Sequence, residues 1–349
     1  MKTLDYLIKK VDAIPINISW YLADLGEAKG KQDLFKNQAP QQLKRLLEHA
    51  IIESAVSSNR IEGVTIDQKR VGTVLFGKSL LKDRNEEEIR GYRDVLDAIH
   101  SQNPRIELSE ATIKTFHARM RGDIWDAGQY KEKDSNIIEK YPDGRERIRF
   151  RTVSAKDTPI YMEELVRKWH DYLKESRVPP LLLLCAFNLD FLCVHPFRDG
   201  NGRVSRLLLL LGCYHLGLEV GRYISLERLI EENKERYYET LEISSQYWHD
   251  GKHDPWPYIG YLLFILKSAY KEFQERVETP QPPKGSKTEM VYRAVNSFID
   301  SFTTADIMEK CPTVSVDLIR KVLRQLSEEG KIQRAGRGRD TVWKKNTLN

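Results

Sequence analysis

Apolar residues recur along most of this chain at the three- and four-residue spacing of an amphipathic helix. Segment 40–63 shows the pattern most clearly. It starts with Pro40, a common first helical residue, and ends at Gly63, a common residue after a helix. Its apolar stripe consists of Leu43, Leu46, Leu47, Ala50, Ile51 and Ala55. The same test predicts further helices at about 85–101, 109–121, 159–175, 179–194, 202–217, 226–248 and 255–278. We therefore expect a mainly α-helical fold.

One segment, 136–153, has the pattern of a β-hairpin. Pro142, Asp143 and Gly144 favour a turn, because they supply a fixed φ, a side-chain acceptor and a freely rotating backbone in that order. After the turn, residues 148–153 alternate between apolar and polar side chains, as strands do. We expect one hairpin on an otherwise helical body.

The C-terminal part has its own pattern. Residues 279–287 are rich in proline and read as a linker. Three short helices are predicted after it, at about 287–300, 304–310 and 315–329, followed by a two-stranded wing with a Gly-Arg tip. This order is typical of a winged helix-turn-helix. The predicted organisation is a helical N-terminal region at 1–110, a core at 111–278, the linker at 279–287 and the winged helix-turn-helix at 288–349.

The net charge, the cysteines and the apolar stretches indicate the compartment and the kinds of partner. The chain carries a net charge of +5, and residues 284–349 alone hold 13 basic against 8 acidic residues, so the whole excess lies there. Such an excess favours an anionic partner of the C-terminal part. The four cysteines form no CxxC pair, which favours a reducing, cytoplasmic compartment. The longest apolar stretches, 181–194 and 207–218, are shorter than the roughly 20 residues of a membrane span, and we expect no membrane partner.

The chemistry is concentrated in "HPFRDGNGRVSR", residues 195–206. Gly200, Asn201 and Gly202 leave backbone N–H groups open just where a helix begins, which makes an anion site. Arg203 and Arg206 lie three residues apart on that helix, and two guanidiniums beside such a nest suit a polyphosphate.

Two further side chains complete the predicted site. The Asp199 carboxylate beside bound phosphates is a candidate ligand of Mg²⁺. His195 is a candidate general base for an incoming hydroxyl, since a neutral imidazole can take its proton. The alternative is a plain helix-turn-helix corner in which both arginines pair with surface acids.

This segment resembles the Fic-family motif HPFx(D/E)GNGRxxR at every fixed position, and the resemblance extends over about residues 40–275. It implies a Fic-type helical core with a β-hairpin flap at 136–153, which docks a target segment by strand addition. It implies transfer of AMP from ATP to a Tyr, Ser or Thr hydroxyl of a target protein, possibly the chain itself, with release of pyrophosphate. The roles implied for the motif are those given above, with ATP and Mg²⁺ bound there. Tyr237 and Tyr238 resemble a pair near the nucleotide, although core packing explains them equally well.

A second motif, "SSNRIEG" at 57–63, fits the family's inhibitory pattern through Ser58, Glu62 and Gly63. A carboxylate at a helix C-terminus is poorly placed against the helix dipole unless it has a cationic partner, and Arg206 is the expected one. Such a pair would occupy the guanidinium intended for the γ-phosphate, so the resemblance implies an autoinhibited enzyme with an N-terminal inhibitory helix.

Two other functions stay open at this point. One is the reverse reaction, removal of AMP from a protein, with Glu62 positioning a water. The other is a DNA-binding regulator whose core only senses nucleotide. Its DNA contacts would come from Arg320, Lys321 and Arg324 on the helix at 315–329, if Leu318, Val322, Leu323 and Leu326 are core, and from Arg334, Arg337 and Arg339 in the wing. The winged helix equally suits a dimer or another protein partner.

Overall fold

The computed structural model describes residues 1–38, 40–67, 70–77, 80–102, 105–140, 143–278, 286–298, 301–335 and 342–345. Most of the predicted linker, the turn residue Pro142, and Arg337 and Arg339 of the predicted wing tip lie outside these ranges. The chain divides into two compact units, Met1–Thr65 with Asp83–Glu278, and Ile66–Lys82 with Thr279–Asn349. Segment 66–82, which follows closely on Glu62, therefore belongs to the unit that contains the C-terminal part.

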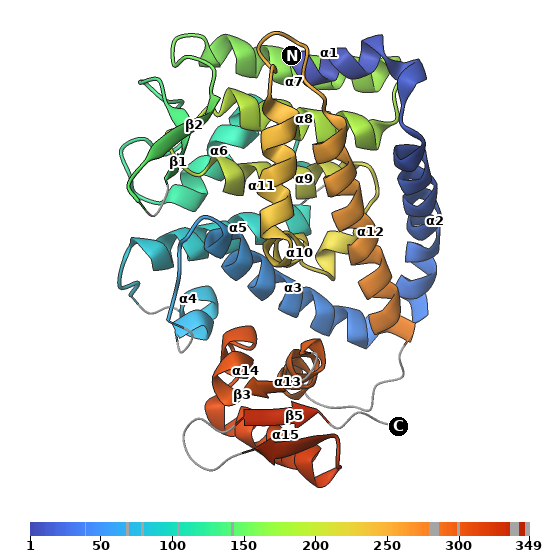
Figure 1. The fold of residues 1–349 in the computed structure, drawn as a ribbon, viewed down its shortest axis with the longest axis vertical. Helices are drawn as coiled ribbons and strands as arrows, with labels where there is room; N and C mark the ends of the chain where they lie inside the picture. The colour runs from blue at the N-terminus through green and yellow to red at the C-terminus, as the bar shows by residue number, and fades with distance from the viewer. Residues whose placement is uncertain are drawn as a thin grey trace. The chain divides into compact units, whose positions relative to one another are not determined.

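The first unit is a helical bundle with one hairpin (Figure 1). Its elements are α1 (Lys2–Lys9), α2 (Ile16–Gln38), α3 (Pro40–Ile61), α5 (Arg84–Gln102), α6 (Glu110–Arg121), β1 (Asn136–Lys140), β2 (Glu146–Arg151), α7 (Thr158–Glu175), α8 (Pro180–Val194), α9 (Asn201–His215), α10 (Leu226–Glu232), α11 (Lys234–Ser245) and α12 (Trp256–Glu278). The predicted fold class, mainly α with a small antiparallel hairpin, is confirmed.

Helices α8 and α9 form the centre of this unit. Every residue of α8 from Leu181 to Val194 is buried, as expected of a helix that is apolar all round. Gly212 lets α9 approach it closely, because a Cβ at that position would lie 2.3 Å from Leu184 Cδ1. The motif at 195–206 begins at the turn between these two helices, so it lies next to the most buried part of the fold.

Two polar residues interrupt α8, and both are fully bonded across the core. Asn188 donates to the Ser205 carbonyl at 2.7 Å and accepts from the Tyr258 hydroxyl at 2.8 Å. Asp190 accepts from the first backbone N–H groups of α1 and, at 2.6 Å, from Trp248 Nε1. They are buried at low cost because each has its partners, and they tie α8 to α9, α12 and α1.

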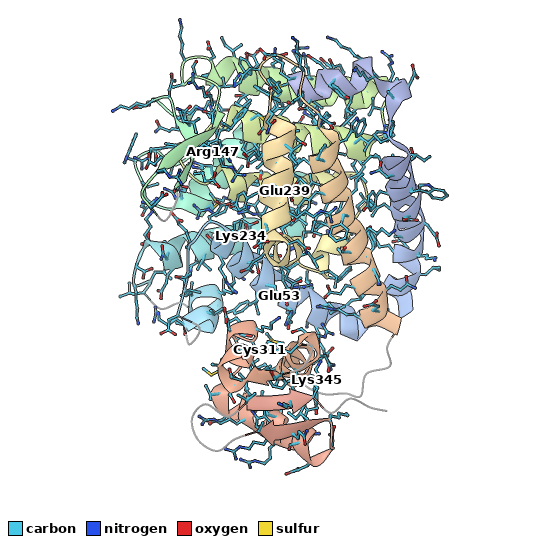
Figure 2. All side chains as sticks on the ribbon, viewed as in Figure 1. Glu53, Arg147, Lys234, Glu239, Cys311 and Lys345 are labelled. Carbon is cyan, nitrogen blue, oxygen red and sulfur yellow. The ribbon has the colours of Figure 1, made fainter. Side chains whose placement is uncertain are left out.

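The hairpin pairs β1 with β2 in antiparallel register from Asn136 opposite Arg151 to Lys140 opposite Glu146, with a bulge between Ile137 and Ile138. On one face, Arg147 and Arg149 reach the Glu242 carboxylate of α11 at 2.6 and 2.8 Å; Arg147 is labelled in Figure 2. The strand pattern at 136–153 therefore predicted the hairpin correctly, and two ion pairs hold it on α11.

The prediction of a single helix at 226–248 is wrong. The structure breaks it at Asn233, whose side chain donates to the Leu229 carbonyl at 2.9 Å and closes α10. Helices α1 and α2 were predicted only as part of a helical N-terminal region, without bounds of their own. In α2, Ile16 and Trp20 are exposed whereas Ile18 and Leu25 are buried, so its apolar residues form no single stripe.

The second unit contains α4 (Val71–Phe76), α13 (Ser286–Ser297), β3 (Ser301–Thr303), α14 (Thr304–Lys310), α15 (Val316–Glu328), β4 (Ile332–Ala335) and β5 (Val342–Lys345). The strands form an antiparallel sheet in the order β3-β5-β4, so the two predicted strands are joined by β3, which the sequence analysis missed. The core face of α15 holds Ile319, Val322, Leu323 and Leu326, with Leu318 only partly buried. Arg320, Lys321 and Arg324 are exposed.

Candidate functional site

His195 stands at a sharp turn at the end of α8. Its backbone is left-handed (φ 52°, ψ 62°), and its N–H still donates to the Phe191 carbonyl at 2.9 Å. Pro196 follows, and a proline disfavours a helical conformation in the residue before it. A left-handed non-glycine residue costs on the order of 1–3 kcal/mol and persists only where its surroundings fix it. The helix thus stops abruptly, and the imidazole is presented on the loop.

The electrostatics of His195 favour a neutral ring. Burial lowers the pKa of the half-buried imidazole to about 4, and the Lys131 ammonium lowers it further, while the carboxylates of Glu62 and Asp199 act in the opposite direction. The ring is therefore unprotonated at neutral pH and able to accept a proton.

The loop that follows is locked by its own side chains. Asn201 Oδ1 accepts from the Phe197 N–H at 2.9 Å, and Asn201 Nδ2 donates to the Phe197 carbonyl at 2.8 Å. Gly200 takes a positive φ of 81° immediately before α9, a conformation that suits glycine. Phe197 is fully buried, and its ring stacks on His117 at 3.8 Å. The N-terminus of α9 is thereby held in one conformation.

A carboxylate occupies the space at this N-terminus. A Cβ added to Gly202 would lie 2.2 Å from Glu62 Oε1, so the Glu62 carboxylate rests against the backbone of Gly202. Glu62 follows the last turn of α3, where Gly63 (φ 80°) and Val64 donate back to Arg60 and Asn59 in a Schellman-type ending. The predicted anion nest therefore faces an anion of the chain itself.

Arg206 connects the two motifs. Its Nη2 donates to Glu62 Oε1 at 2.8 Å and to the Ser58 carbonyl at 2.9 Å, and its Nε donates to Ser58 Oγ at 2.8 Å. The guanidinium is only 3% exposed, and among the described residues its Nη1, which lies near Gly202, has no hydrogen-bond partner. The structure thus brings together four predicted residues, Ser58, Glu62, Gly202 and Arg206. Nη1 of Arg206 is the nitrogen that no described residue accepts from.

Arg203 points elsewhere than Arg206. It is 1% exposed, forms an ion pair with Glu88 of α5 and donates to Asn59 Oδ1 at 3.0 Å. Glu88 also accepts from Arg121 Nη1 at 2.5 Å, and the same nitrogen donates to Asp199 Oδ2 at 2.7 Å. The geometry makes Arg203 part of a buried network that orients α9.

Sequence reasoning missed three residues of this region: Glu88, Arg121 and His117. His117 Nδ1 accepts from the Gly128 N–H at 2.8 Å, so its Nε2 carries the proton given to the Asp199 carbonyl at 3.1 Å. Burial lowers the pKa of this imidazole to about 4. Each of the three lies on a helix without a local motif, and only the fold brings it to the loop.

Tyr237 and Tyr238 lie on α11 in different settings. Tyr237 is buried among aromatic rings, 5.8 Å from the Tyr261 ring. Tyr238 donates weakly to the Ile61 carbonyl at the end of α3 at 3.4 Å, and Arg149 of the hairpin donates to the Tyr238 carbonyl at 3.0 Å. The pair therefore lies beside the end of α3, with one ring in the core and one facing the hairpin.

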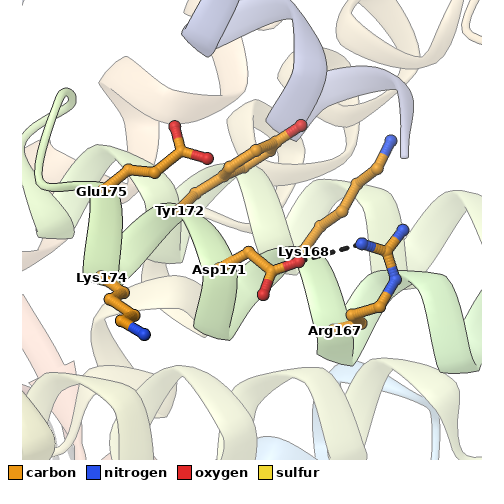
Figure 3. Close-up of a pocket in the computed structure, with 6 residues that line it drawn as sticks. All are labelled: Arg167, Lys168, Asp171, Tyr172, Lys174 and Glu175. Carbon is orange, nitrogen blue, oxygen red and sulfur yellow. Dashed lines mark hydrogen bonds and ion pairs between the residues drawn. The ribbon is translucent and has the colours of Figure 1, made fainter.

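A hollow on the outside of α7 is no rival to this site. It has a volume of about 540 Å³ and is lined by Arg167, Lys168, Asp171, Tyr172, Lys174 and Glu175, all from one helix (Figure 3). Lys168 and Tyr172 already bind Asp5, and no residue of the motif takes part.

The donor set around Asp199 fits one Mg²⁺ ion held jointly with phosphates. Its carboxylate is 57% exposed, and its oxygens accept single bonds, from Arg121 and from the Gly200 N–H. Mg²⁺ bound with a nucleotide commonly uses one or two carboxylates. In the described part of the chain no three His, Cys, Asp or Glu residues gather as a metal cage, and no described helix has the length and hydropathy to cross a membrane.

Known proteins share the fold and the motif region. Residues 107–212 match the Fic/DOC family model. A Fido domain-containing protein of Dictyostelium discoideum is 27% identical over 128 residues, 35% of this chain and 82% of that protein. The protein adenylyltransferase Fic of Nematostella vectensis is 26% identical over 183 residues, 48% of this chain but only 38% of that protein. A Fic family protein from Desulfovibrio desulfuricans G20 superposes with a TM-score of 0.63 at 22% identity, covering 97% of this chain and 98% of that one. With the motif, the fold and the family model in agreement, the chain carries a Fic/DOC family domain at residues 107–212.

Proposed function

We propose that this chain transfers AMP from ATP to a hydroxyl of a target protein, releases pyrophosphate, and is held inactive by Glu62. The observation that carries the proposal is the Glu62 carboxylate against Gly202 at the start of α9, bonded to Arg206 at 2.8 Å. A helix N-terminus with a buried guanidinium is an anion site, and here an acid of the chain fills it.

His195 is the general base of the proposed reaction. Its neutral imidazole takes the proton of the target hydroxyl as the hydroxyl oxygen forms a bond to the α-phosphorus of ATP. The bond between the α-phosphorus and the bridging oxygen then breaks, and pyrophosphate leaves with that oxygen. Such base catalysis contributes about 10²–10⁴-fold to a rate. Because its pKa is lowered to about 4, the His195 ring is neutral at pH 7 and free to accept a proton.

The phosphates would bind the backbone N–H groups of Gly200, Asn201 and Gly202 and the guanidinium of Arg206. Nη1 of Arg206 has no hydrogen-bond partner among the described residues, and this supports the assignment, since a buried donor without a partner is costly. Arg203 would have a different role. Its side chain bonds Glu88 and Asn59, and these contacts orient α9. Asp199 would hold Mg²⁺, which neutralises phosphate charge when bound. Tyr237 and Tyr238 stay candidates for the nucleotide surroundings.

Inhibition would follow because Glu62 and the γ-phosphate of ATP compete for the guanidinium of Arg206. While Glu62 pairs with Arg206, the γ-phosphate cannot take the guanidinium, and ATP binds without its α-phosphate in line with the target hydroxyl. Alignment of two reactants can be worth about 7–11 kcal/mol, so a misplaced phosphate suffices to silence the enzyme. Ser58 supports the pair by accepting from Arg206 Nε.

The target segment would dock on the β1–β2 hairpin by adding a strand. A two-stranded sheet leaves strand edges free for a third strand, and the ion pairs from Arg147 and Arg149 to Glu242 keep the hairpin in place. The proposed target is either another protein or a second copy of the chain.

Two alternatives use the same geometry. In the reverse reaction, Glu62 would orient a water toward an AMP-modified protein. In a nucleotide-sensing regulator, the exposed Arg320, Lys321 and Arg324 of α15 would contact DNA; no comparison supports that partner, and the winged-helix assignment remains a prediction. The cytoplasmic assignment likewise remains a prediction, supported by four cysteines that are all buried and free.

The test is incubation of the purified chain and of a cell lysate with ATP labelled at the α-phosphate. The proposal expects covalent label on protein, located on a Tyr, Ser or Thr hydroxyl by mass spectrometry and increased when Glu62 is replaced by Gly. Protein-bound label from γ-labelled but not from α-labelled ATP, or no protein-bound label from either form of the chain, contradicts it. Release of AMP from pre-modified protein by the wild type alone favours the reverse reaction.

A further inference from the structure

Lys131 lies beneath the turn that carries His195. It belongs to the loop between α6 and β1, and its side chain is 5% exposed. Its Nζ donates to the Val194 carbonyl at 3.2 Å, and its backbone N–H donates to the Pro196 carbonyl at 2.8 Å. These two carbonyls belong to the residues on either side of His195, so Lys131 holds both flanks of the turn.

The same ammonium reaches the base of the hairpin. Lys131 Nζ donates to Thr152 Oγ1 at 2.7 Å, and Thr152 Oγ1 donates to the Ser135 carbonyl at 2.5 Å. Ser135 directly precedes β1, and Thr152 directly follows β2. Lys131 is therefore the link between the two ends of the hairpin and the His195 turn.

Burial of a lysine ammonium at this position is energetically unfavourable. The described partners of the buried ammonium are neutral oxygens, and a buried cation without a bonded carboxylate costs free energy. Burial accordingly lowers the pKa of Lys131 to about 8, although Asp134 acts to raise it. An uncharged side chain would fill this position at a lower free-energy cost. Packing alone therefore does not explain why the residue is charged.

We propose that Lys131 is a positioning residue for AMP transfer, which fixes the backbone around His195 from the base of the hairpin and places a positive charge beside the ring. This inference rests on the proposed role of His195 as base. The other charged groups that act on the ring are the carboxylates of Glu62, after α3, and Asp199, in the loop. Both favour the protonated ring, so Lys131 opposes them.

The direct test is the titration of the His195 ring in the full chain, followed by NMR with ¹³C-labelled histidine and assigned with His195→Ala. Lys131→Met should raise the pKa of His195 by about 1 unit, because a nearby like charge has been removed. Lys131→Arg should titrate as the wild type does, and so should Lys133→Met, which changes an exposed lysine of the same loop. If Lys131→Met does not fold, Lys131→Gln, which keeps hydrogen-bond donors without the charge, carries the same expectation. A wild-type titration in the neutral variants overturns the inference.

Activity supplies the second readout, measured in a Glu62→Gly background. Lys131→Met should lower kcat about 10- to 100-fold with little change in the KM for ATP, since the loop is misplaced but the phosphate site is untouched. Lys131→Arg should recover most of the rate. An unchanged kcat in Lys131→Met overturns the positioning role. The ring titration needs no turnover, so absence of AMP transfer in every form would refute the proposed function and leave the titration to judge Lys131.

Discussion

Arg206 donates from Nη2 to the Glu62 carboxylate at 2.8 Å, across 144 residues of sequence. The sequence analysis predicted this pair, and the structure contains it; its inhibitory role remains a prediction. The geometry adds what the motif could not supply. Glu62 touches the backbone of Gly202 as well as the guanidinium, so one acid covers both parts of the predicted phosphate site.

Replacement of His195 by Ala should abolish AMP transfer and leave ATP binding nearly intact. The imidazole is assigned to the target hydroxyl and makes no contact assigned to the phosphates, so a loss of about 10²–10⁴-fold is expected in the rate alone. Single-turnover kinetics and calorimetric ATP binding, both in the Glu62→Gly background, separate the two effects. Retained activity in purified His195→Ala protein would refute the base assignment.

The pH dependence of kcat/KM should show an unusually low acid limb. Because the pKa of His195 is lowered to about 4, the ring stays neutral and active as pH falls from 7 to 5, and the rate is lost only near pH 4. In Glu62→Gly the limb should lie lower still, since the lost carboxylate favoured protonation. The rate at pH 5 should be within about twofold of that at pH 7. A limb near 6.5, the ordinary histidine value, contradicts the assigned environment.

Asp199→Asn should weaken the Mg²⁺-dependent part of ATP binding. The substitution keeps the size and the acceptor for the Gly200 N–H but removes the charge that a hard cation prefers. Calorimetric titration of ATP with Mg²⁺ and with EDTA, for both proteins, measures the difference. If affinity depends on Mg²⁺ equally in the two, the metal role of Asp199 is wrong.

Glu88→Gln should lower the free energy of unfolding by about 3–5 kcal/mol, because it leaves the buried cations Arg121 and Arg203 without their shared carboxylate. Urea denaturation measures the loss. Glu87→Gln, at the exposed neighbouring position on α5, is the control and should change stability by less than about 0.5 kcal/mol. Equal stability of both variants would show that the network contributes nothing to the fold.

The parts of the fold and site that could be predicted were those with local signals. The stripe from Leu43 to Ala55 predicts α3, and the spacing of Gly200, Arg203 and Arg206 identifies the loop and helix of the site, because each pattern lies within a few turns of chain. The same local spacing could not distinguish the two arginines. Arg206 meets Glu62, whereas Arg203 is buried against Glu88, and that difference depends on which helices surround α9.

What escaped prediction depends on long-range contacts. Arg121 reaches Asp199 across 78 residues, and His117 reaches the Asp199 carbonyl across 82, while neither stands in a recognisable motif. Lys131 looks like one more loop lysine until the fold places it under His195. The break at Asn233 was missed for a related reason: a side chain bonding its own helix end competes with a continuous apolar pattern.

The central claim is that Glu62 blocks the phosphate site through Arg206, and the most direct measurement is AMP incorporation by four forms of the chain. Glu62→Gly should incorporate far more AMP than the wild type, in itself and in a target. Adding Arg206→Ala should remove the gain, since the phosphate site then lacks its guanidinium. Arg60→Ala, which removes a charge two residues before Glu62 that pairs with Glu231, should behave as the wild type does. Equal incorporation by the wild type and Glu62→Gly would contradict the account.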